Sequence, residues 1–164
     1  MNVSDVMTTN PTCCIPSDTA QTAAIIMRDE DTGIVPIVEN KENCKLIGVV
    51  TDRDLCLTLI AEKSRTPEAR DPAKVPIEHC MTSELVVCEA DDDVDHVLEL
   101  MKENQVRRIL VVDGGTRIKG IVSLADLMNR ASLPKGETSD TLKTISTPTP
   151  EASKPRAESA RAGE

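Results

Sequence analysis

The chain has 164 residues, a formal net charge of −9 and no phenylalanine, tyrosine or tryptophan. This length suits one ordinary domain or two small ones. The acidic charge disfavours nucleic acid and anionic membranes as partners, because their phosphate groups repel it, and the lack of aromatic rings argues against single-strand binding by base stacking. No apolar stretch is long enough to span a membrane, and the N-terminus lacks a secretory signal. We therefore expect a cytoplasmic protein.

The first half of the chain predicts short elements in the order β-α-β-β-α. Asp18, with Gln21 three residues later, is typical of a helix capping box, and Gly33 is a helix stop signal. Pro36 within an apolar run implies an edge strand or a bulge. The core face of the first helix is predicted to hold Ala20, Ala23, Ala24 and Met27. The expected elements are a helical turn at 3–7, strands at 12–15, 34–38 and 46–50, and helices from Asp18 and from Thr51 to about Lys63.

The second half predicts the same order again. We expect Asp92 to cap a helix, Asp113-Gly114-Gly115-Thr116 to form a tight turn and Ser123 to cap a last helix that ends near Ala131. The strands are expected at 85–88, 106–112 and 118–122, and the core helical face at Val94, Val97, Leu98 and Met101. The predicted organisation is a first repeat at 1–63, a linker at 64–76, a second repeat at 77–132 and a disordered tail at 133–164.

The two halves are copies of one another. Met7-Thr8 returns as Met81-Thr82, 74 positions later. A repeat of this length indicates two copies of one structural unit. Each copy is too small to bury a large core alone, so we expect them to pack with approximate two-fold symmetry as one α/β (α+β) module. A cleft between packed units is a usual place for a ligand.

A Gly-apolar-apolar-[Thr/Ser]-x-x-Asp string occurs once in each copy, from Gly48 to Asp54 and from Gly120 to Asp126. In each, a helix is expected to begin at the hydroxyl residue, Thr51 or Ser123. Backbone N–H groups at a helix start attract phosphate, and a carboxylate three residues later suits vicinal ribose hydroxyls. The same spacing also fits a simple capping box; recurrence in both copies favours the nucleotide site.

The order of elements, the Met-Thr openings, the Val106 to Asp113 strand and the Thr51-Asp52-Arg53-Asp54-Leu55 string resemble a tandem pair of CBS (cystathionine β-synthase) domains, or Bateman module, over about residues 3–131. This resemblance implies two small mixed sheets facing each other with helices outside. It also implies a regulatory module that binds AMP, ADP, ATP or S-adenosylmethionine between the repeats, and association into a disc-like homodimer. Helix residues Leu55, Leu59, Leu124 and Met128 are candidates for that dimer face.

Site residues follow from the resemblance. It assigns Thr51 and Ser123 to phosphate, Asp54 and Asp126 to ribose, and the first strand and its neighbourhood to adenine. Arg107 and Arg108 match a basic position that often reaches phosphate, where the first copy has Gly33 and Ile34; Arg53 adds a charge where the second copy has Ala125. We therefore expect unequal sites. The candidate ligand-binding residues are Thr51, Asp54, Ser123, Asp126, Arg107, Arg108, Arg53, Cys14, Ile34 and Val87.

The remaining chemistry-bearing residues give weaker signals. Cys14 and Cys88 occupy the same strand position in the two copies, as small buried hydrophobic residues do. A zinc site or redox switch built from Cys13, Cys14 or Cys80 with His79 lacks ligand spacing, and no metal site is expected. No catalytic motif is present, so we expect a non-enzymatic binding module with no required cofactor, an adenine nucleotide as regulatory ligand and an effector protein as partner. The alternatives are a structural dimerisation module with empty clefts and a cysteine-based redox or metal sensor.

Overall fold

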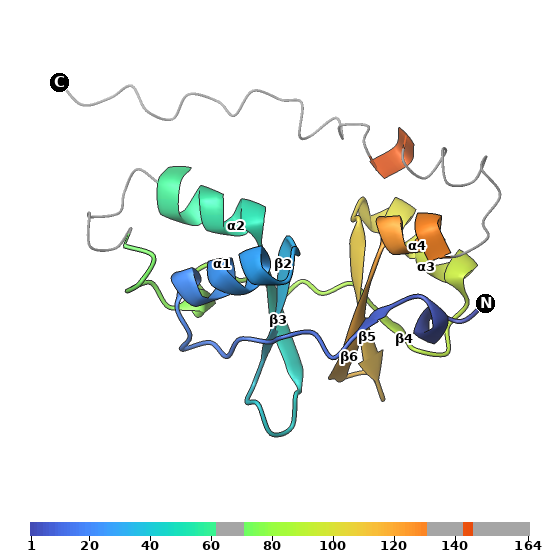
Figure 1. Ribbon diagram of the computed structural model, residues 1–164, viewed down its shortest axis with the longest axis horizontal. Helices are drawn as coiled ribbons and strands as arrows, with labels where there is room; N and C mark the ends of the chain where they lie inside the picture. Colours follow the sequence, from blue (N-terminus) through green and yellow to red (C-terminus); the bar gives the residue numbers. More distant parts are fainter. Residues whose placement is uncertain (62–70, 131–142, 146–164) are drawn as a thin grey trace.

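The computed structural model describes residues 1–61, 71–130 and 143–145. It contains two halves placed side by side, each with a small sheet toward the centre and helices on the outside (Figure 1). The expected α/β class with two facing sheets is therefore confirmed. Apart from 143–145, the expected tail lies outside the described residues; part of the expected linker does too, although Val75 within it is buried in the first core.

The first repeat builds a two-stranded sheet covered by two helices. Strands β2 and β3 are antiparallel, with Pro36 opposite Val49 and a bulge between Ile37 and Val38, so a proline next to a bulge in this small sheet agrees with expectation. The helix after β3 continues through a π-helical turn, η2. The elements are α1 (Ala20–Asp29), β2 (Ile34–Val38), β3 (Leu46–Thr51), α2 (Asp52–Cys56) and η2 (Leu57–Ala61).

The second repeat contributes most of a four-stranded sheet in the order β1-β6-β5-β4. Gly114 and Gly115 both have positive φ angles, 60° and 77°, in the tight turn between β5 and β6, which glycine adopts without steric cost. The elements of this half are η4 (Ile77–His79), β4 (Val87–Glu89), α3 (Val94–Asn104), β5 (Arg108–Asp113), β6 (Arg117–Ser123) and α4 (Leu124–Arg130). The first repeat opens with η1 (Val3–Asp5) and β1 (Thr8–Thr9).

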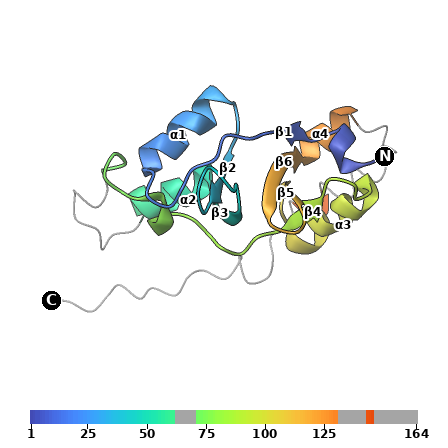
Figure 2. The same ribbon diagram turned by 90° about the horizontal axis from the view of Figure 1, so that it is seen from below.

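The opening segment of each repeat packs on the other repeat. Strand β1 pairs with β6, with Thr9 opposite Gly120, and Thr82 forms an isolated bridge to Val49 of β3. Figure 2 shows the N-terminal segment running from the second half of the molecule to the first. The repeated Met-Thr pairs are therefore the residues by which the two copies exchange segments.

Three apolar clusters hold the described residues together. One lies within each repeat, and the third lies between the facing sheets, where Ile34 and Val49 of the first repeat meet Leu110 and Ile121 of the second. Burial of this shared surface, at roughly 25 cal/mol per Å², fixes how the copies sit against one another. All four predicted core residues of α3 are buried.

Several local predictions were wrong by small amounts. Thr19 caps α1, and Asp93 caps α3. The expected caps, Asp18 and Asp92, instead accept hydrogen bonds from the backbone N–H groups of Ile15 and Glu89, both at 2.9 Å. Each of these aspartates therefore closes the turn that precedes its helix.

Three further predictions about the first repeat also need correction. Ala24 is exposed on α1, where partly buried Ile26 packs on the core instead. The strand expected at 12–15 is reduced to a single parallel bridge from Cys14 to Ile37. Helix α1 ends at Asp29, and the left-handed residue beyond it is Asp31 at φ 49°, not Gly33.

Candidate functional site

Among the described residues, two clefts open between the repeats. Cleft 1, with a volume of about 630 Å³, is lined by Thr51, Arg53, Thr82, Gln105, Arg107 and Arg108 among others. Cleft 2, with a volume of about 560 Å³, is lined by Thr8, Glu30, Asp31, Arg108, Ser123 and Asp126 among others. Both volumes are in the range of small-molecule sites.

The clefts are built from equivalent positions of the two copies. Each joins the strand–helix corner of one repeat to the helix–strand loop of the other. Thr51 and Thr82 line cleft 1, and their counterparts, Ser123 and Thr8, line cleft 2. The duplication in the sequence has therefore become a duplication of ligand-sized cavities.

Each Thr/Ser-x-x-Asp string forms a complete capping box. Thr51 donates to Asp54 Oδ2 through its backbone N–H at 2.9 Å and its hydroxyl at 2.7 Å, and the Asp54 N–H donates back to the Thr51 hydroxyl at 3.2 Å. Ser123 and Asp126 repeat this pattern at 2.9, 2.6 and 3.1 Å. The capping interpretation is thus confirmed. It leaves Oδ1 of each carboxylate outside the box, so it is compatible with a second role in binding.

The first-turn amides of α2 are already occupied. Asp52 N–H donates to the Gly33 carbonyl at 3.2 Å, and Arg53 N–H donates to Asp52 Oδ1 at 2.7 Å. With the Asp54 amide inside the capping box, no N–H in this first turn is left for an anion. Recognition of a phosphate in cleft 1 therefore depends on the arginine side chains rather than on the helix start.

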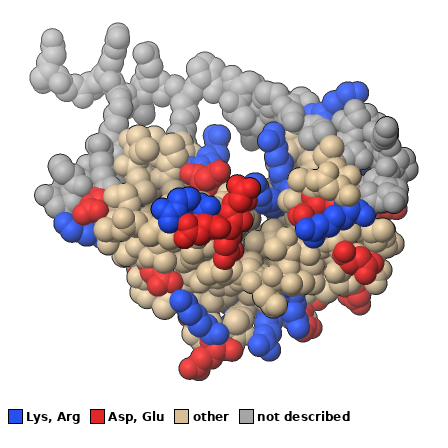
Figure 3. Space-filling model, viewed as in Figure 1, with Lys and Arg blue, Asp and Glu red and all other residues tan. Residues whose placement is uncertain are grey.

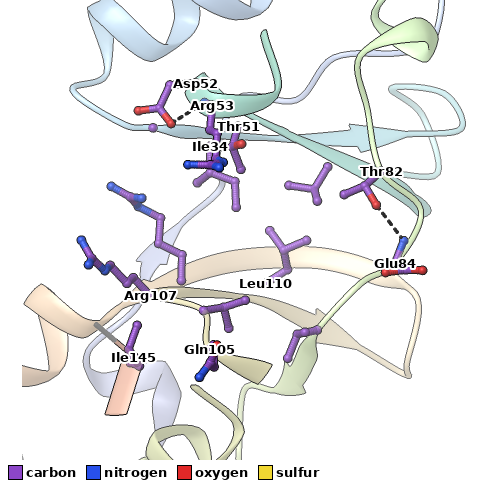
Figure 4. A pocket seen from close by; sticks show the side chains of 15 residues that line it. Ile34, Thr51, Asp52, Arg53, Thr82, Glu84, Gln105, Arg107, Leu110 and Ile145 are labelled. Atoms are coloured by element: carbon purple, nitrogen blue, oxygen red, sulfur yellow. Dashed lines mark hydrogen bonds between the residues drawn. The ribbon is translucent and has the colours of Figure 1, made fainter. Parts of the chain in front are cut away.

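Arginines of both repeats converge on cleft 1. Figure 4 shows Arg53 above the cavity and Arg107 below it, with Ile34 and Leu110 as apolar walls between them. Both arginines are exposed. Arg108 lines both clefts. The arginine pair of the second repeat thus faces the hydroxyl residue of the first, so cleft 1 takes its polar groups from both repeats.

The other sequence-predicted site residues are spread between the clefts and the core. Ile34 lines both clefts, and Asp126 lines cleft 2. Asp54 is half-buried and outside the described lining of both clefts. Cys14 is fully buried in the first core, and partly buried Val87 packs on the cluster between the sheets.

Sequence reasoning missed several lining residues. Gln105 and Asp31 line clefts 1 and 2, and their spacing of 74 residues was a signal that could have found them together. Glu30 also lines cleft 2 and accepts a hydrogen bond from the Thr12 hydroxyl. Ile145 contacts the second core and lines cleft 1; no pattern in the polar tail pointed to it.

The cysteines at equivalent strand positions behave as core residues. Cys14 and Cys88 are free thiols and are buried. Burial, with a smaller contribution from the neighbouring carboxylates Asp18 and Asp92, raises the pKa of Cys14 to about 11 and that of Cys88 to about 12. Both thiols therefore stay protonated at neutral pH, which disfavours nucleophilic and metal-binding roles.

In residues 1–61, 71–130 and 143–145, no group of three or more His, Cys, Asp and Glu side chains is arranged to hold a metal ion. Over the same ranges, none of the helices has the length and apolar character needed to cross a bilayer.

The chain is similar to several known proteins. Uncharacterized protein YlbB of Bacillus subtilis is 38% identical over 125 residues, covering 76% of this chain and 78% of that protein. Hypoxic response protein 1 of Mycobacterium tuberculosis has a crystal structure with two coordinated zinc ions; it is 30% identical, with a TM-score of 0.66 over 82% of this chain and 100% of that one.

A third relative was solved with ligands. The CBS domain pair of protein MJ0100, in complex with 5′-methylthioadenosine and S-adenosyl-L-methionine, is 28% identical, with a TM-score of 0.66 over 78% of this chain and 93% of that one. The family model of the CBS domain matches residues 3–60 and 77–132. The chain therefore belongs to the CBS-domain family and carries two CBS domains in tandem.

Proposed function

We propose that this protein is a regulatory module that binds an adenosine-containing ligand between its two CBS domains and signals the bound state to a partner protein. The main support for this proposal is the arrangement of residues in cleft 1. In cleft 1, Arg107 of one repeat faces Thr51 and Arg53 of the other across apolar walls. A ligand with an apolar base, a polar sugar and an anionic end fits this arrangement of apolar walls, a hydroxyl group and arginine side chains.

The parts of the ligand can be assigned to parts of the cleft. Ile34, Val86 and Leu110 offer an aliphatic surface for adenine. Arg53 and Arg107 then face the phosphate, with which charged donors form strong hydrogen bonds. In cleft 2, Asp126 accepts from ribose through Oδ1. In cleft 1, Asp54 takes this role only after a small adjustment, since it stands outside the described lining.

The MJ0100 domain pair supports the ligand class, because 5′-methylthioadenosine and S-adenosylmethionine share the adenosine group. A ligand that touches both repeats changes the free energy of their packing. It can shift the arrangement of the two halves only by as much as its affinities for the two arrangements differ. The proposed role is therefore signalling by binding, without catalysis, and the cytoplasmic location remains a prediction.

Thermal unfolding tests the proposal. AMP, ATP, S-adenosylmethionine and 5′-methylthioadenosine are each added to the full chain, with cytidine monophosphate as a control for phosphate and ribose alone. At 100-fold excess over Kd, stabilisation is about 2.7 kcal/mol, and the midpoint rises by about 2–4 °C per kcal/mol for a chain of this size. Circular dichroism is the readout, since the chain has no tryptophan or tyrosine.

Two variants assign the binding energy to the clefts. Asp126→Ala and Asp54→Ala are each expected to remove part of the ligand-induced rise in the midpoint, measured against each variant's own ligand-free midpoint. The proposal is wrong when none of the four adenosine compounds raises the midpoint of the wild-type chain above the cytidine monophosphate control.

Exposed apolar side chains favour a homodimer as a second property. Ile60 is 73% exposed, and Leu57, Met128 and Ile25 are also exposed on helices. The expected face needs correction, because Leu55 and Leu124 are buried in the two cores. Light scattering after gel filtration tests this: a dimer that Ile60→Lys converts to a monomer supports it, and a wild-type monomer contradicts it.

A further inference from the structure

The two clefts differ in charge although they are built from equivalent positions. Three arginines and two carboxylates line cleft 1: Arg53, Arg107, Arg108, Asp52 and Glu84. In cleft 2 the balance is reversed. One arginine and three carboxylates line it: Arg108, Glu30, Asp31 and Asp126.

The difference arises from substitutions between the copies. Arg53 and Arg107 of cleft 1 correspond to Ala125 and Gly33 in the other copy, which lack charge. Helix α3 ends at Asn104 and is followed by Gln105, whereas the equivalent positions of the first copy, directly after α1, hold Glu30 and Asp31. The side chains at these equivalent positions therefore contribute to the difference in charge between the two clefts.

The acidic pair of cleft 2 sits where local structure disfavours it. A helix C-terminus carries partial negative charge and favours cations, yet Glu30 and Asp31 directly follow α1. Glu30 is held by the Thr12 hydroxyl, and Asp31 adopts a left-handed φ of 49°. Both carboxylates are exposed on the cleft side of the chain, where they repel an incoming anion.

Arg108 does little to offset this acidity. A Cβ placed on Gly33 would lie 2.9 Å from Asp52 Oδ2 and 3.4 Å from Arg108 Nη2. Both side chains therefore reach toward Gly33, which lines cleft 1 and not cleft 2, so the charge of Arg108 is shared between the two clefts. Figure 3 shows basic side chains beside the hollow between the two halves and a group of acidic side chains just in front of it.

We propose that the clefts divide adenosine compounds by charge: cleft 1 takes a phosphate-bearing nucleotide, and cleft 2 rejects phosphate and takes an uncharged or cationic adenosine derivative. This inference rests on the proposed function and adds the ligand class of each cleft. The chain then responds to two adenosine compounds through two clefts that are built from equivalent positions and carry opposite net charge.

Isothermal titration calorimetry on the full chain tests the division, with AMP as the anionic probe and 5′-methylthioadenosine as the uncharged one. The wild-type chain is expected to bind one AMP. A chain saturated with AMP is expected to bind one 5′-methylthioadenosine in addition. Arg107→Ala is expected to weaken AMP binding about tenfold, which is 1.4 kcal/mol, and to leave the second event unchanged.

The decisive variant is Glu30→Gln with Asp31→Asn, which removes two charges from cleft 2 and keeps the shapes; asparagine tolerates the left-handed φ. AMP stoichiometry is expected to rise from one to two. The matched control is Asp91→Asn with Glu103→Gln, two exposed carboxylates that line neither cleft; it makes the same change in net charge and should keep one AMP. Thermal midpoints confirm that both variants are folded.

The outcomes separate this inference from the function on which it rests. Two AMP molecules of similar affinity on the wild-type chain, or a single AMP on the Glu30→Gln, Asp31→Asn variant, would overturn the division by charge while AMP binding itself stands. If neither AMP nor 5′-methylthioadenosine binds, the proposed function fails, and the division fails with it.

Discussion

Substitution of Gly120 by alanine tests whether the opening segment of the first repeat packs on the second repeat. It lies on β6 between β1 and β5, opposite Thr9 on one side and Val111 on the other, and its φ is outside the left-handed region. Alanine therefore fits the backbone conformation. Its Cβ would, however, lie 2.8 Å from the Thr8 carbonyl oxygen and 2.7 Å from Met7 Sδ, so β1 must move away for the variant to fold.

Overpacking of this kind costs about 1–3 kcal/mol, against a gain of about 0.4–1 kcal/mol from a less flexible unfolded chain. The centres of these two ranges leave a net loss of about 1.3 kcal/mol for Gly120→Ala. Gly48→Ala should lose less, because its nearest backbone atom, the Thr82 oxygen, would lie 3.1 Å away. Gly33→Ala is the control, since its closest contact is the end of the exposed Asp52 side chain.

Urea unfolding followed by circular dichroism measures these differences as shifts in midpoint at constant slope. The expected order of stability is Gly33→Ala, then Gly48→Ala, then Gly120→Ala. If Gly120→Ala is as stable as Gly33→Ala, then β1 does not pack on Gly120 in solution, and the exchange of segments between the copies is refuted.

Three other predictions concern stability and thiol chemistry. Ser123→Ala should lower the free energy of unfolding by about 0.5–2 kcal/mol, because it removes a helix cap; an unchanged urea midpoint would contradict the capping box. At pH 8, Ellman's reagent should react with exposed Cys56 and spare buried Cys14 and Cys88, which rapid labelling of all three thiols would disprove. The pKa values of Cys14 and Cys88 are raised from 9.0 to about 11 and about 12. The stability that these protonated thiols contribute is therefore complete below pH 9 and is lost as pH rises through 11–12. Between pH 8 and pH 10.5, the urea midpoint should fall by more in the wild-type chain than in a Cys14→Ala, Cys88→Ala variant.

Much of the fold was predictable because its signals are local and occur twice. The core face of α3 follows from helical spacing, and Gly114-Gly115 predicts its turn because both residues need positive φ. The helix caps were wrong by one residue, since a run such as Asp91-Asp92-Asp93 offers several acceptors. Only the structure shows that Asp92 closes the preceding turn while Asp93 caps the helix.

The exchange of segments could not be predicted, because β1 is two residues long and pairs with a strand more than 100 positions away. The sequence did show Met-Thr and Gly in both copies. That Met7 packs against Gly120, and Met81 against Gly48, is a tertiary contact with no local pattern.

The hydroxyl and basic candidates were easier to place on the clefts than their surroundings, and their roles in binding remain predictions. Thr51, Ser123 and Arg107 lie on the clefts, as the resemblance implied. The crossing of Arg107 to the other repeat depends on packing between sheets. The acidic character of cleft 2 depends on Glu30 and Asp31, which look like an ordinary solvated helix end until the cleft is seen beside them.

A crystal structure of the full chain with AMP would test directly whether one ligand binds between the two repeats. We expect AMP in cleft 1, with adenine against Ile34 and Leu110 and the phosphate between Arg53 and Arg107, so that one ligand touches both repeats. AMP bound to a single repeat or outside both clefts would contradict it.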